Sequence, residues 1–393
     1  MPDASSGSSA VLIAGVPSLN KAVFHRVRFA PHDPVSWIRL PGGTSVMIVR
    51  DVELPRARAS RRADDVNAYE DFTPDAGLSG DRAIRAAQAT AECLVRNGVS
   101  RVVSDRTLAL IFVDELRRRG IDVECDRDLG IIERRQKDET EVAALRTAQQ
   151  ITEEAIRMAC ERIASADTDD EGRLLDADNP GQPLTSERVM QMLDLFLAER
   201  QCASEGHIVA GGQDGADCHE PGSGPLRSGQ PVIVDVFPRH LPTGYHGDCT
   251  RTVVHGRIPD KLAKMHAAVA EAKKAALDVT RAGATGEDVH KAAVAVIQEH
   301  GYKLGFPPVD AADTVPADFC SMPHGTGHGI GLDLKEPPLL DFGGPELLAG
   351  DAVTVEPGLY ALDLGGVRLE DLVIVREGGY DNLNTLHEGL EWH

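Results

Sequence analysis

The feature that most constrains the fold of this chain is an internal repeat. Residues 229–235, Gly-Gln-Pro-Val-Ile-Val-Asp, lie 121 positions before residues 350–356, Gly-Asp-Ala-Val-Thr-Val-Glu. In each copy a glycine is followed six residues later by an acid that ends a valine-rich strand. A second acid follows in each copy, because Asp248 lies 122 positions before Glu370. The matched order predicts two related halves that bring four carboxylates to one pseudo-twofold axis.

Four carboxylates on β-strands need a compensating charge. Asp and Glu are depleted in strands, and an ionised carboxylate is costly to bury unless a cation or a donor accompanies it. A pair of divalent metal ions is the simplest compensation, because such ions bind carboxylate oxygen and imidazole nitrogen. Imidazole is available in residues 323–331, Pro-His-Gly-Thr-Gly-His-Gly-Ile-Gly, where His324 and His328 are four residues apart.

The length of 393 residues suits two or three domains. Strand and helix signals alternate in the first third of the chain, at residues 36–40, 44–49, 81–97, 102–103, 107–119 and 121–125. This alternation predicts an α/β domain over residues 1–135, and a charged stretch at 134–139 predicts the linker. The second domain would then occupy residues 136–393.

The second domain begins with a helix signal. Asp138 and Glu141 have the spacing of a capping box, and a long amphipathic pattern follows them. Helical periodicity returns over 184–200 and 260–300. Between the first two of these helices, the acidic residues 164–181 predict a surface loop.

The balance of charge argues against two classes of partner. The chain has 41 Lys and Arg against 62 Asp and Glu, a net charge of −21, which repels a phosphate backbone and an anionic membrane. Its apolar run at residues 11–16 is far shorter than a membrane span. Seven cysteines without a C-x-x-C pair are typical of a reducing compartment. We therefore expect a cytoplasmic protein without nucleic-acid or membrane partners.

Taken together, these motifs resemble the pita-bread metallopeptidases: Xaa-Pro dipeptidase (prolidase), Xaa-Pro aminopeptidase (aminopeptidase P) and, more distantly, methionine aminopeptidase. The resemblance covers roughly residues 135–393. It rests on the blocks I-V-D, G-D-C-T-R-T, H-G-T-G-H-G-I-G-L, T-V-E-P-G-L-Y and G-V-R-L-E-D, in the family's order. It implies an α+β pita-bread catalytic domain with a pseudo-twofold repeat. Residues 1–135 resemble, less closely, the creatinase-type α/β domain of prolidases, and these relatives imply a homodimer.

By this resemblance, two divalent metal ions per subunit bind to five residues: Asp235, Asp248, His328, Glu356 and Glu370. Asp248 and Glu370 would bridge both ions. Asp235 would serve one ion alone, and His328 with Glu356 would serve the other. Manganese is the first expectation because carboxylate-rich sites suit it, with zinc or cobalt as alternatives.

The resemblance also assigns catalytic and substrate-binding roles. His219 matches a histidine that lies near the substrate, and His324 matches one that lines the proline pocket. Tyr360 and Arg368 match positions beside the two glutamates and are expected to contact substrate. Glu356 matches the residue that carries a proton from the attacking water to the proline nitrogen.

One catalytic position departs from the family pattern. Lys335 stands where the family usually has a histidine that stabilises the tetrahedral intermediate. A lysine supplies positive charge but cannot shuttle protons near neutrality unless its pKa is strongly depressed. The side chain can point into the site as a fixed charge or outward into solvent. We expect the outward orientation, because two cations would repel the ammonium, and His219 would then act on the oxyanion.

The sequence thus predicts a cytoplasmic dinuclear metallopeptidase that hydrolyses the Xaa-Pro bond of dipeptides through a metal-bridging hydroxide. The short interval between Glu356 and Glu370 favours a dipeptidase over the first alternative, an Xaa-Pro aminopeptidase acting on longer peptides. A second alternative is a non-catalytic pita-bread binding protein, which only Lys335 favours. A creatinase-like amidinohydrolase fits less well, since those relatives do not keep the metal ligands.

Overall fold

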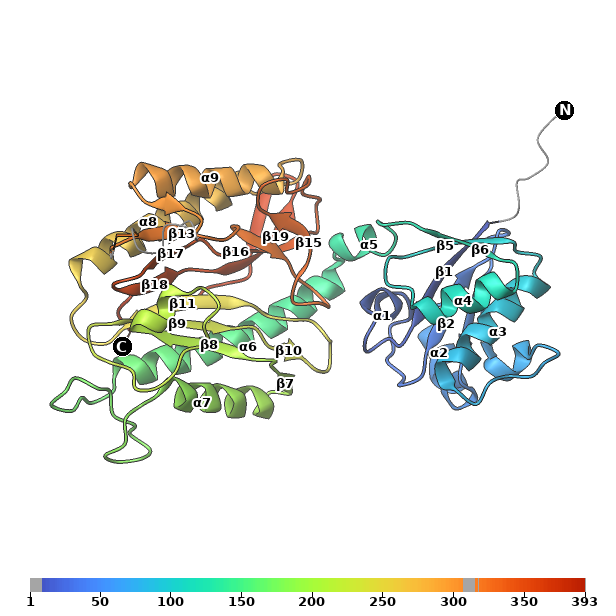
Figure 1. Ribbon diagram of the computed structural model, residues 1–393, viewed down its shortest axis with the longest axis horizontal. Coiled ribbons are helices and arrows are strands. Elements are labelled where there is room, and N and C mark those ends of the chain that lie inside the picture. The colour runs from blue at the N-terminus through green and yellow to red at the C-terminus, as the bar shows by residue number, and fades with distance from the viewer. Residues whose placement is uncertain (1–8, 307–314, 317, 393) are drawn as a thin grey trace. The chain divides into compact units, whose positions relative to one another are not determined.

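The computed structural model describes residues 9–306, 315–316 and 318–392 and divides into two units, residues 1–134 and residues 135–393 (Figure 1). Within the described residues, none of the helices is both long and apolar enough to cross a membrane. Each unit has its own hydrophobic clusters of buried side chains.

The first unit is built on one six-stranded sheet with the strand order β4-β3-β2-β1-β5-β6. Strand β1 pairs antiparallel with β2 and parallel with β5. Helices α3 and α4 pack on one apolar cluster of the sheet, and α1 and α2 pack on another. The elements are β1 (Ser9–Gly15), α1 (Lys21–Val27), β2 (Val35–Arg39), β3 (Ser45–Val49), η1 (Asp51–Glu53), α2 (Leu54–Ser60), β4 (Asp65–Ala68), η2 (Tyr69–Phe72), α3 (Arg82–Arg96), β5 (Arg101–Ser104), α4 (Leu110–Arg118) and β6 (Asp122–Cys125).

The second unit follows a short helix, α5 (Ile132–Arg135), at the boundary. Its first half consists of α6 (Glu139–Ala164), α7 (Ser186–Glu199), β7 (Cys202–Ala203), β8 (His207–Gly211), η3 (Gly212–Ala216), β9 (Pro231–Val236), β10 (Arg239–His240) and β11 (Cys249–Val254). The predicted capping box is present at the start of α6, where the side chains of Asp138 and Glu141 each accept a hydrogen bond from the other residue's backbone.

The other half of the second unit consists of α8 (Asp260–Val279), α9 (Gly286–Glu299), β12 (Lys303–Leu304), β13 (Cys320–Met322), β14 (Gly327–Gly329), β15 (Glu336–Leu340), β16 (Ala352–Val355), β17 (Gly358–Ala361), β18 (Gly365–Arg368), β19 (Asp371–Arg376) and β20 (Gly379–Asn382). These strands form a four-stranded sheet, β12-β13-β17-β18, and a five-stranded sheet, β15-β14-β16-β19-β20. Helices α8 and α9 lie along their outer side (Figure 1).

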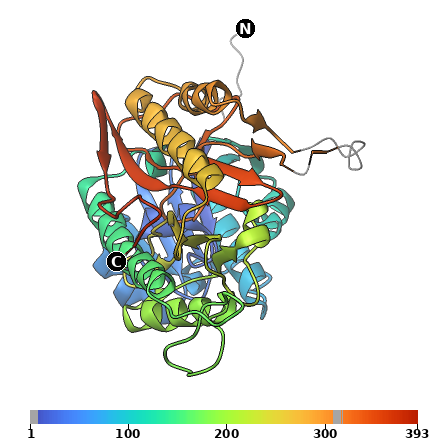
Figure 2. The ribbon, with the colours of Figure 1, turned by 90° about the vertical axis from the view of Figure 1, so that its left-hand side faces the viewer.

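The two halves of the second unit form a layered structure with the strands inside. Helices α6 and α7 lie on one side and α8 and α9 on the other, as the perpendicular view confirms (Figures 1 and 2). The repeated sequence segments occupy equivalent positions, because β9 pairs antiparallel with β11 and β16 pairs antiparallel with β19. The acids noted in the sequence lie at or next to the ends of these four strands.

Candidate metal centre and active site

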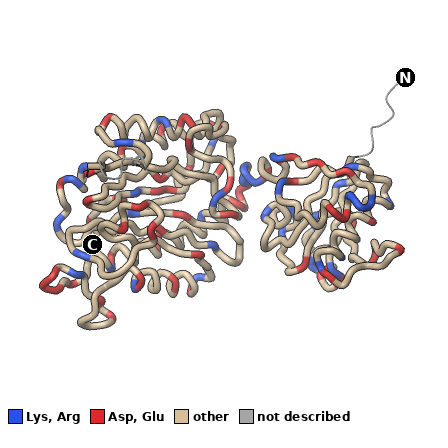
Figure 3. The backbone as a smooth tube through the Cα atoms, viewed as in Figure 1, with Lys and Arg blue, Asp and Glu red and all other residues tan. Residues whose placement is uncertain are grey.

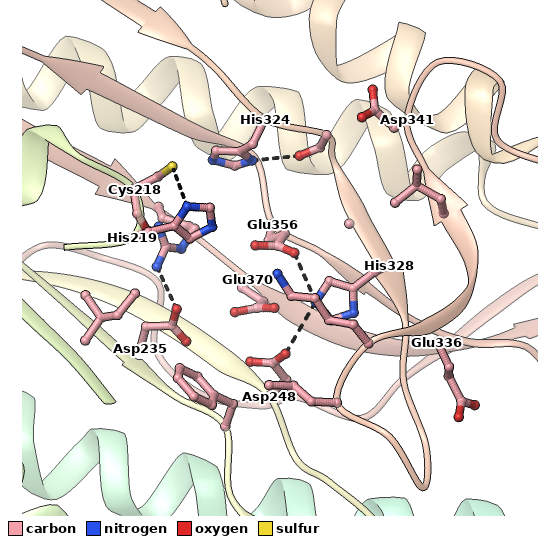
Figure 4. A pocket seen from close by; sticks show the side chains of 18 of the residues that line it. Cys218, His219, Asp235, Asp248, His324, His328, Glu336, Asp341, Glu356 and Glu370 are labelled. Atoms are coloured by element: carbon pink, nitrogen blue, oxygen red, sulfur yellow. Dashed lines mark hydrogen bonds and ion pairs between the residues drawn. The ribbon is translucent and has the colours of Figure 1, made fainter. Parts of the chain in front are cut away.

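A cavity of about 890 Å³ opens between the two halves of the second unit (Figure 4). Its wall combines β8, β9 and the residue before β11 from one half with β14, β15 and β18 from the other. The residues that the sequence singled out and that line this cavity are His219, Asp235, Asp248, His324, His328, Lys335, Glu356, Arg368 and Glu370.

Three acids meet at the base of the cavity. Asp235, Asp248 and Glu370 are buried, and each offers a carboxylate oxygen that lies within 4.8 Å of the oxygens of the other two. The Nε2 atom of His328 lies 3.7 Å from Oδ2 of Asp248 and 3.5 Å from Oε1 of Glu356. The structure therefore brings together five residues that the sequence places as much as 135 positions apart (Figure 4).

Glycine 327 allows His328 to reach this position. A Cβ atom added at Gly327 would lie 2.0 Å from the carbonyl oxygen of Thr354, so only glycine lets β14 lie this close to β16. The Thr354 hydroxyl then accepts a hydrogen bond from the backbone N–H of His328, at 3.1 Å, and donates one to Oε1 of Glu356, at 3.2 Å. One threonine thus holds the backbone of His328 and the side chain of Glu356.

The electrostatics of the acids show what the site requires. Burial, and then the charges of neighbouring acids, raise the pKa of Asp248 and of Glu370 well above the usual range. Burial also raises the pKa of Asp235, although Arg368 opposes it. For Glu356, burial favours a higher pKa, but the charges of His328 and other nearby cations outweigh it and the pKa is lowered. Such acids can all be ionised together only beside a cation.

One carboxylate oxygen supports this conclusion directly. Oδ1 of Asp235 is buried and has no hydrogen-bond partner among the described residues, while Oδ2 accepts a 2.6 Å hydrogen bond from Nη2 of Arg368. An unpartnered carboxylate oxygen beside two further carboxylates and an imidazole is the donor set that divalent cations prefer. The residues present therefore fit the metal ions that the sequence predicts.

A chain of hydrogen bonds extends from the acids along the cavity wall. The Arg368 guanidinium, which binds Asp235, also donates to the hydroxyl of Tyr360 at 2.7 Å. Nε2 of His324 lies 2.9 Å from the same hydroxyl. His324 and Arg368 line the cavity, whereas Tyr360 is not part of the described cavity lining and lies behind these two side chains. The Tyr360 hydroxyl joins these two side chains, and its contact with substrate stays a prediction.

The exposed His219 also lines the cavity, on the side of Cys218 (Figure 4). Its Nδ1 lies 3.7 Å from Sγ of Cys218, whose carbonyl oxygen accepts a hydrogen bond from Arg368. This histidine is therefore free to contact a bound molecule while its backbone is tied to the wall that holds Asp235 (Figure 4).

Lys335 lies in the cavity wall, and the outward orientation of its ammonium stays a prediction. Lys335 precedes β15 and lines the cavity, although the residue remains exposed. Burial is the main influence on the pKa of Asp248 and of Glu356, and the Lys335 ammonium is among the charges that lower both values. The neighbouring Glu336 forms a buried 2.6 Å ion pair with Lys137. The charge of Lys335 thus acts on both acids from an exposed position in the cavity wall.

Sequence reasoning missed several residues that line the cavity, among them Glu205, His207, Phe237 and Asp341. Asp341 forms a 3.3 Å contact with His290 of α9, and no sequence pattern connects these two positions. The only available signal was a polar residue at the edge of an apolar strand, which occurs on many surfaces without a functional role.

The chain is similar in sequence to a known protein family and to several known proteins. Residues 143–377, more than half of the chain, match metallopeptidase family M24. The chain is 36% identical over 190 residues to the probable dipeptidase PepE of Mycobacterium tuberculosis, and the match covers 46% of each protein. It is 28% identical over 266 residues to the Xaa-Pro dipeptidase of Pyrococcus furiosus, covering 67% of this chain and 66% of the relative. The match thus spans about half the length of the mycobacterial relative and about two thirds of the archaeal one.

Solved structures agree with the fold expected from the sequence. The Xaa-Pro dipeptidase of Bacillus anthracis superposes with a TM-score of 0.77 at 22% identity, covering 98% of this chain and 94% of that one. The prolidase of Pyrococcus horikoshii superposes with a TM-score of 0.72, also at 22% identity, covering 98% and 95%. The α+β pita-bread prediction is confirmed. With its repeat, its acids and its fold all in agreement with the match over residues 143–377, the chain belongs to metallopeptidase family M24.

Proposed function

We propose that this protein is a dinuclear metallopeptidase that hydrolyses the Xaa-Pro bond of dipeptides. The observation that carries the proposal is the convergence of three buried acids from both halves, one of them with an unpartnered oxygen, beside His328 and Glu356 in one cavity. The names of the similar proteins, a probable dipeptidase and an Xaa-Pro dipeptidase, support this class of reaction.

The residues that would hold two divalent ions are Asp235, Asp248, His328, Glu356 and Glu370. The chemistry that such ions supply is the activation of a water molecule and the polarisation of a carbonyl oxygen. Manganese is our choice of native ion, because four of the five ligands are carboxylates.

Glu356 is the residue best placed to move a proton. Its lowered pKa keeps the carboxylate ionised, so it can accept a proton from the attacking water. The hydroxyl adds to the scissile carbonyl carbon, the C–N bond breaks, and the proton passes from Glu356 to the proline nitrogen. The products are a free amino acid and proline.

Two cavity residues are available to stabilise the negative oxygen that forms on the carbonyl. Lys335 supplies a positive charge next to the acids, and His219 supplies an exposed imidazole across the cavity. A donor aimed at a developing oxyanion contributes about 3 kcal/mol in comparable sites. We assign the oxyanion to Lys335, because it stands where the family has a histidine for this purpose.

The lining of the cavity supports a binding place for the proline ring of the substrate. His324 lines the same cavity as four apolar residues: Pro337, Pro338, Leu339 and Pro345. Such a surface packs against a pyrrolidine ring and removes apolar area from water.

The homodimer and the cytoplasmic location stay predictions from the resemblance and from the composition of the chain.

The proposal is tested by metal analysis and product analysis together. We expect close to two divalent ions per chain after reconstitution, and loss of activity on chelation. We also expect cleavage of Xaa-Pro dipeptides and little cleavage of Xaa-Pro-Yaa tripeptides. Comparable rates on tripeptides would move the assignment to an Xaa-Pro aminopeptidase, and full activity of the metal-free chain would refute the metallopeptidase.

A further inference from the structure

We propose that Gln149, a residue of helix α6, is a positioning residue that holds Asp248 in the metal centre. The inference rests on the proposed function, because it concerns the assembly of the same site. Gln149 is fully buried, yet its side chain is a polar amide in the core of the second unit. A buried amide must find hydrogen-bond partners, and those that this one finds lie at Asp248.

The backbone of Asp248 lies just before β11, where the strand ladder does not yet provide partners. The Gln149 side chain supplies both missing bonds. The backbone N–H of Asp248 donates to Oε1 of Gln149 at 2.9 Å, and Nε2 of Gln149 donates to the carbonyl oxygen of Asp248 at 2.8 Å. The two bonds form a closed ring that fixes the position and the orientation of this peptide segment.

The preceding residue shows that this contact depends on a close approach. A Cβ atom added at Gly247 would lie 2.3 Å from the hydroxyl oxygen of Thr152 and 2.8 Å from the carbonyl oxygen of Ala148, both in α6. Only glycine permits the chain to lie directly on the helix. The approach places the next residue, Asp248, within reach of the Gln149 amide.

The same amide connects Asp248 to the second half of the repeat. Nε2 of Gln149 also donates to Oδ1 of Asn384 at 3.1 Å, and this oxygen accepts the backbone N–H of Leu372 at 2.8 Å. Leu372 lies two residues after Glu370. Two side-chain amides therefore link the segments that carry the two acids expected to bridge the metal ions.

Such a link has a specific use in this site. Carboxylate oxygens of Asp235, Asp248 and Glu370 all lie within 4.8 Å of one another in a buried position. In the absence of metal, repulsion among these acids favours movement of the segment away from the cluster. Gln149 and Asn384 oppose that movement and keep the carboxylate in place before an ion binds. Outer residues that orient metal ligands typically contribute 10- to 100-fold to metal affinity.

The test compares two substitutions on one face of α6. Gln149→Met keeps the length of the side chain and removes both bonds to Asp248. Glu153→Gln is the matched control: Glu153 is also buried, one turn later, and accepts hydrogen bonds from the backbone N–H groups of Thr385 and Leu386, with no hydrogen bond to Asp248 among the described residues. Both variants should lower the melting temperature, because each disturbs the packing of the helix against the C-terminal segment.

Metal affinity, measured by titration calorimetry with Mn²⁺, separates positioning from packing. We expect Gln149→Met to weaken the affinity by about 10- to 100-fold and Glu153→Gln to change it by less than about threefold. At saturating Mn²⁺, the KM of Gln149→Met for an Xaa-Pro dipeptide should stay close to that of the wild type. In the metal-free protein, hydrogen exchange at the Asp248 amide should be faster in Gln149→Met than in the control.

A third variant, Asn384→Ala, keeps the two bonds to Asp248 and removes the link to Leu372. We expect it to lose an intermediate amount of metal affinity. If Gln149→Met fails to fold, Asn384→Ala replaces it in the test. Wild-type affinity in both Gln149→Met and Asn384→Ala, or an equal loss in Glu153→Gln, would overturn the inference. A wild-type chain that binds two ions but does not cleave Xaa-Pro dipeptides would overturn only the proposed function. A wild-type chain that binds no Mn²⁺ would overturn both.

Discussion

The charge of Lys335 is the feature of a single residue with the clearest consequence for catalysis. Lys335 lines the cavity, and its charge is among those that lower the pKa of Asp248 and of Glu356. We expect Lys335→Ala to lower kcat by about 100- to 1000-fold, because the loss of one donor to the oxyanion costs about 2.7–4 kcal/mol. Steady-state kinetics at saturating metal provide the measurement.

Two controls accompany that measurement. Metal content should be unchanged in Lys335→Ala, because the lysine is not among the proposed ligands. Lys335→His should recover part of the lost rate, because an imidazole also donates a hydrogen bond. A change in kcat of less than about threefold would show that Lys335 does not act on the transition state and that His219 carries this role.

Single residues also show where prediction from sequence ends. The repeat and the His-Gly-Thr-Gly-His motif singled out Asp235, His328 and Glu356, and the structure brings them to one cavity. The bond between Gln149 and Asp248 joins positions 99 residues apart. A glutamine inside a helix has an ordinary helix propensity, so its role becomes visible only when the partner strand is placed against the helix.

At the scale of elements, the approach of β14 to β16 depends on one missing side chain. Alanine at position 327 would place its Cβ 2.0 Å from the carbonyl oxygen of Thr354, a contact that only backbone movement can relieve. We expect Gly327→Ala to lower the free energy of unfolding by at least about 2 kcal/mol. Urea denaturation measures it, with Gly42→Ala as control, because a Cβ at Gly42 meets no atom within 4 Å. Equal stabilities would contradict the close packing.

Asp176, in the loop between α6 and α7, should make the free energy of unfolding depend on pH. Burial favours a higher pKa for Asp176, but hydrogen bonds from groups including Asn179, Arg188 and Arg162 outweigh it and lower the pKa to about 2. A lowered pKa stabilises the fold at neutral pH, and this contribution disappears as the pH falls from about 4 to 2. Asp176→Asn should therefore cost about 2 kcal/mol at pH 7 and much less near pH 2. The control is Asp170→Asn, an exposed acid of the same loop.

Elements with strong local signals were predicted correctly from the sequence. Helix α3 lies within the expected range 81–97, and α8 and α9 lie in the expected range 260–300. Helix α2 was missed because its sequence, Leu-Pro-Arg-Ala-Arg-Ala-Ser, buries only Ala57 and lacks an apolar face. Strands β12, β13 and β14 have two or three residues, too few to show an alternating pattern, and tertiary contacts decide their structure.

At the scale of the whole molecule, metal binding should raise the thermal stability of only one of the two units. All proposed ligands lie in residues 135–393, and each unit has its own hydrophobic clusters. We expect scanning calorimetry to resolve two transitions, of which added Mn²⁺ raises only one. At a free metal concentration 100 times the dissociation constant, each site adds about 2.7 kcal/mol. A single transition, or equal shifts of two, would contradict separate stabilities.

Charge is also distributed unevenly over the whole molecule. Residues 1–134 contain as many Lys and Arg as Asp and Glu, so the net charge of −21 resides in residues 135–393 (Figure 3). An acidic surface around a cavity raises the local concentration of cations and repels anions. The net negative charge of residues 135–393 should therefore favour the approach of metal ions, and high ionic strength should slow their association.

The pseudo-twofold repeat has a consequence for the order of events in the cell. Each half supplies two of the acids, and a ribosome that has made Asp235 must add 135 more residues before Glu370 exists. Domains form from the N-terminus during synthesis, so the first half can fold while its pair of acids has no counterpart. A nascent chain that ends before Glu370 lacks part of the proposed ligand set. The complete set can assemble only after the second half has been translated.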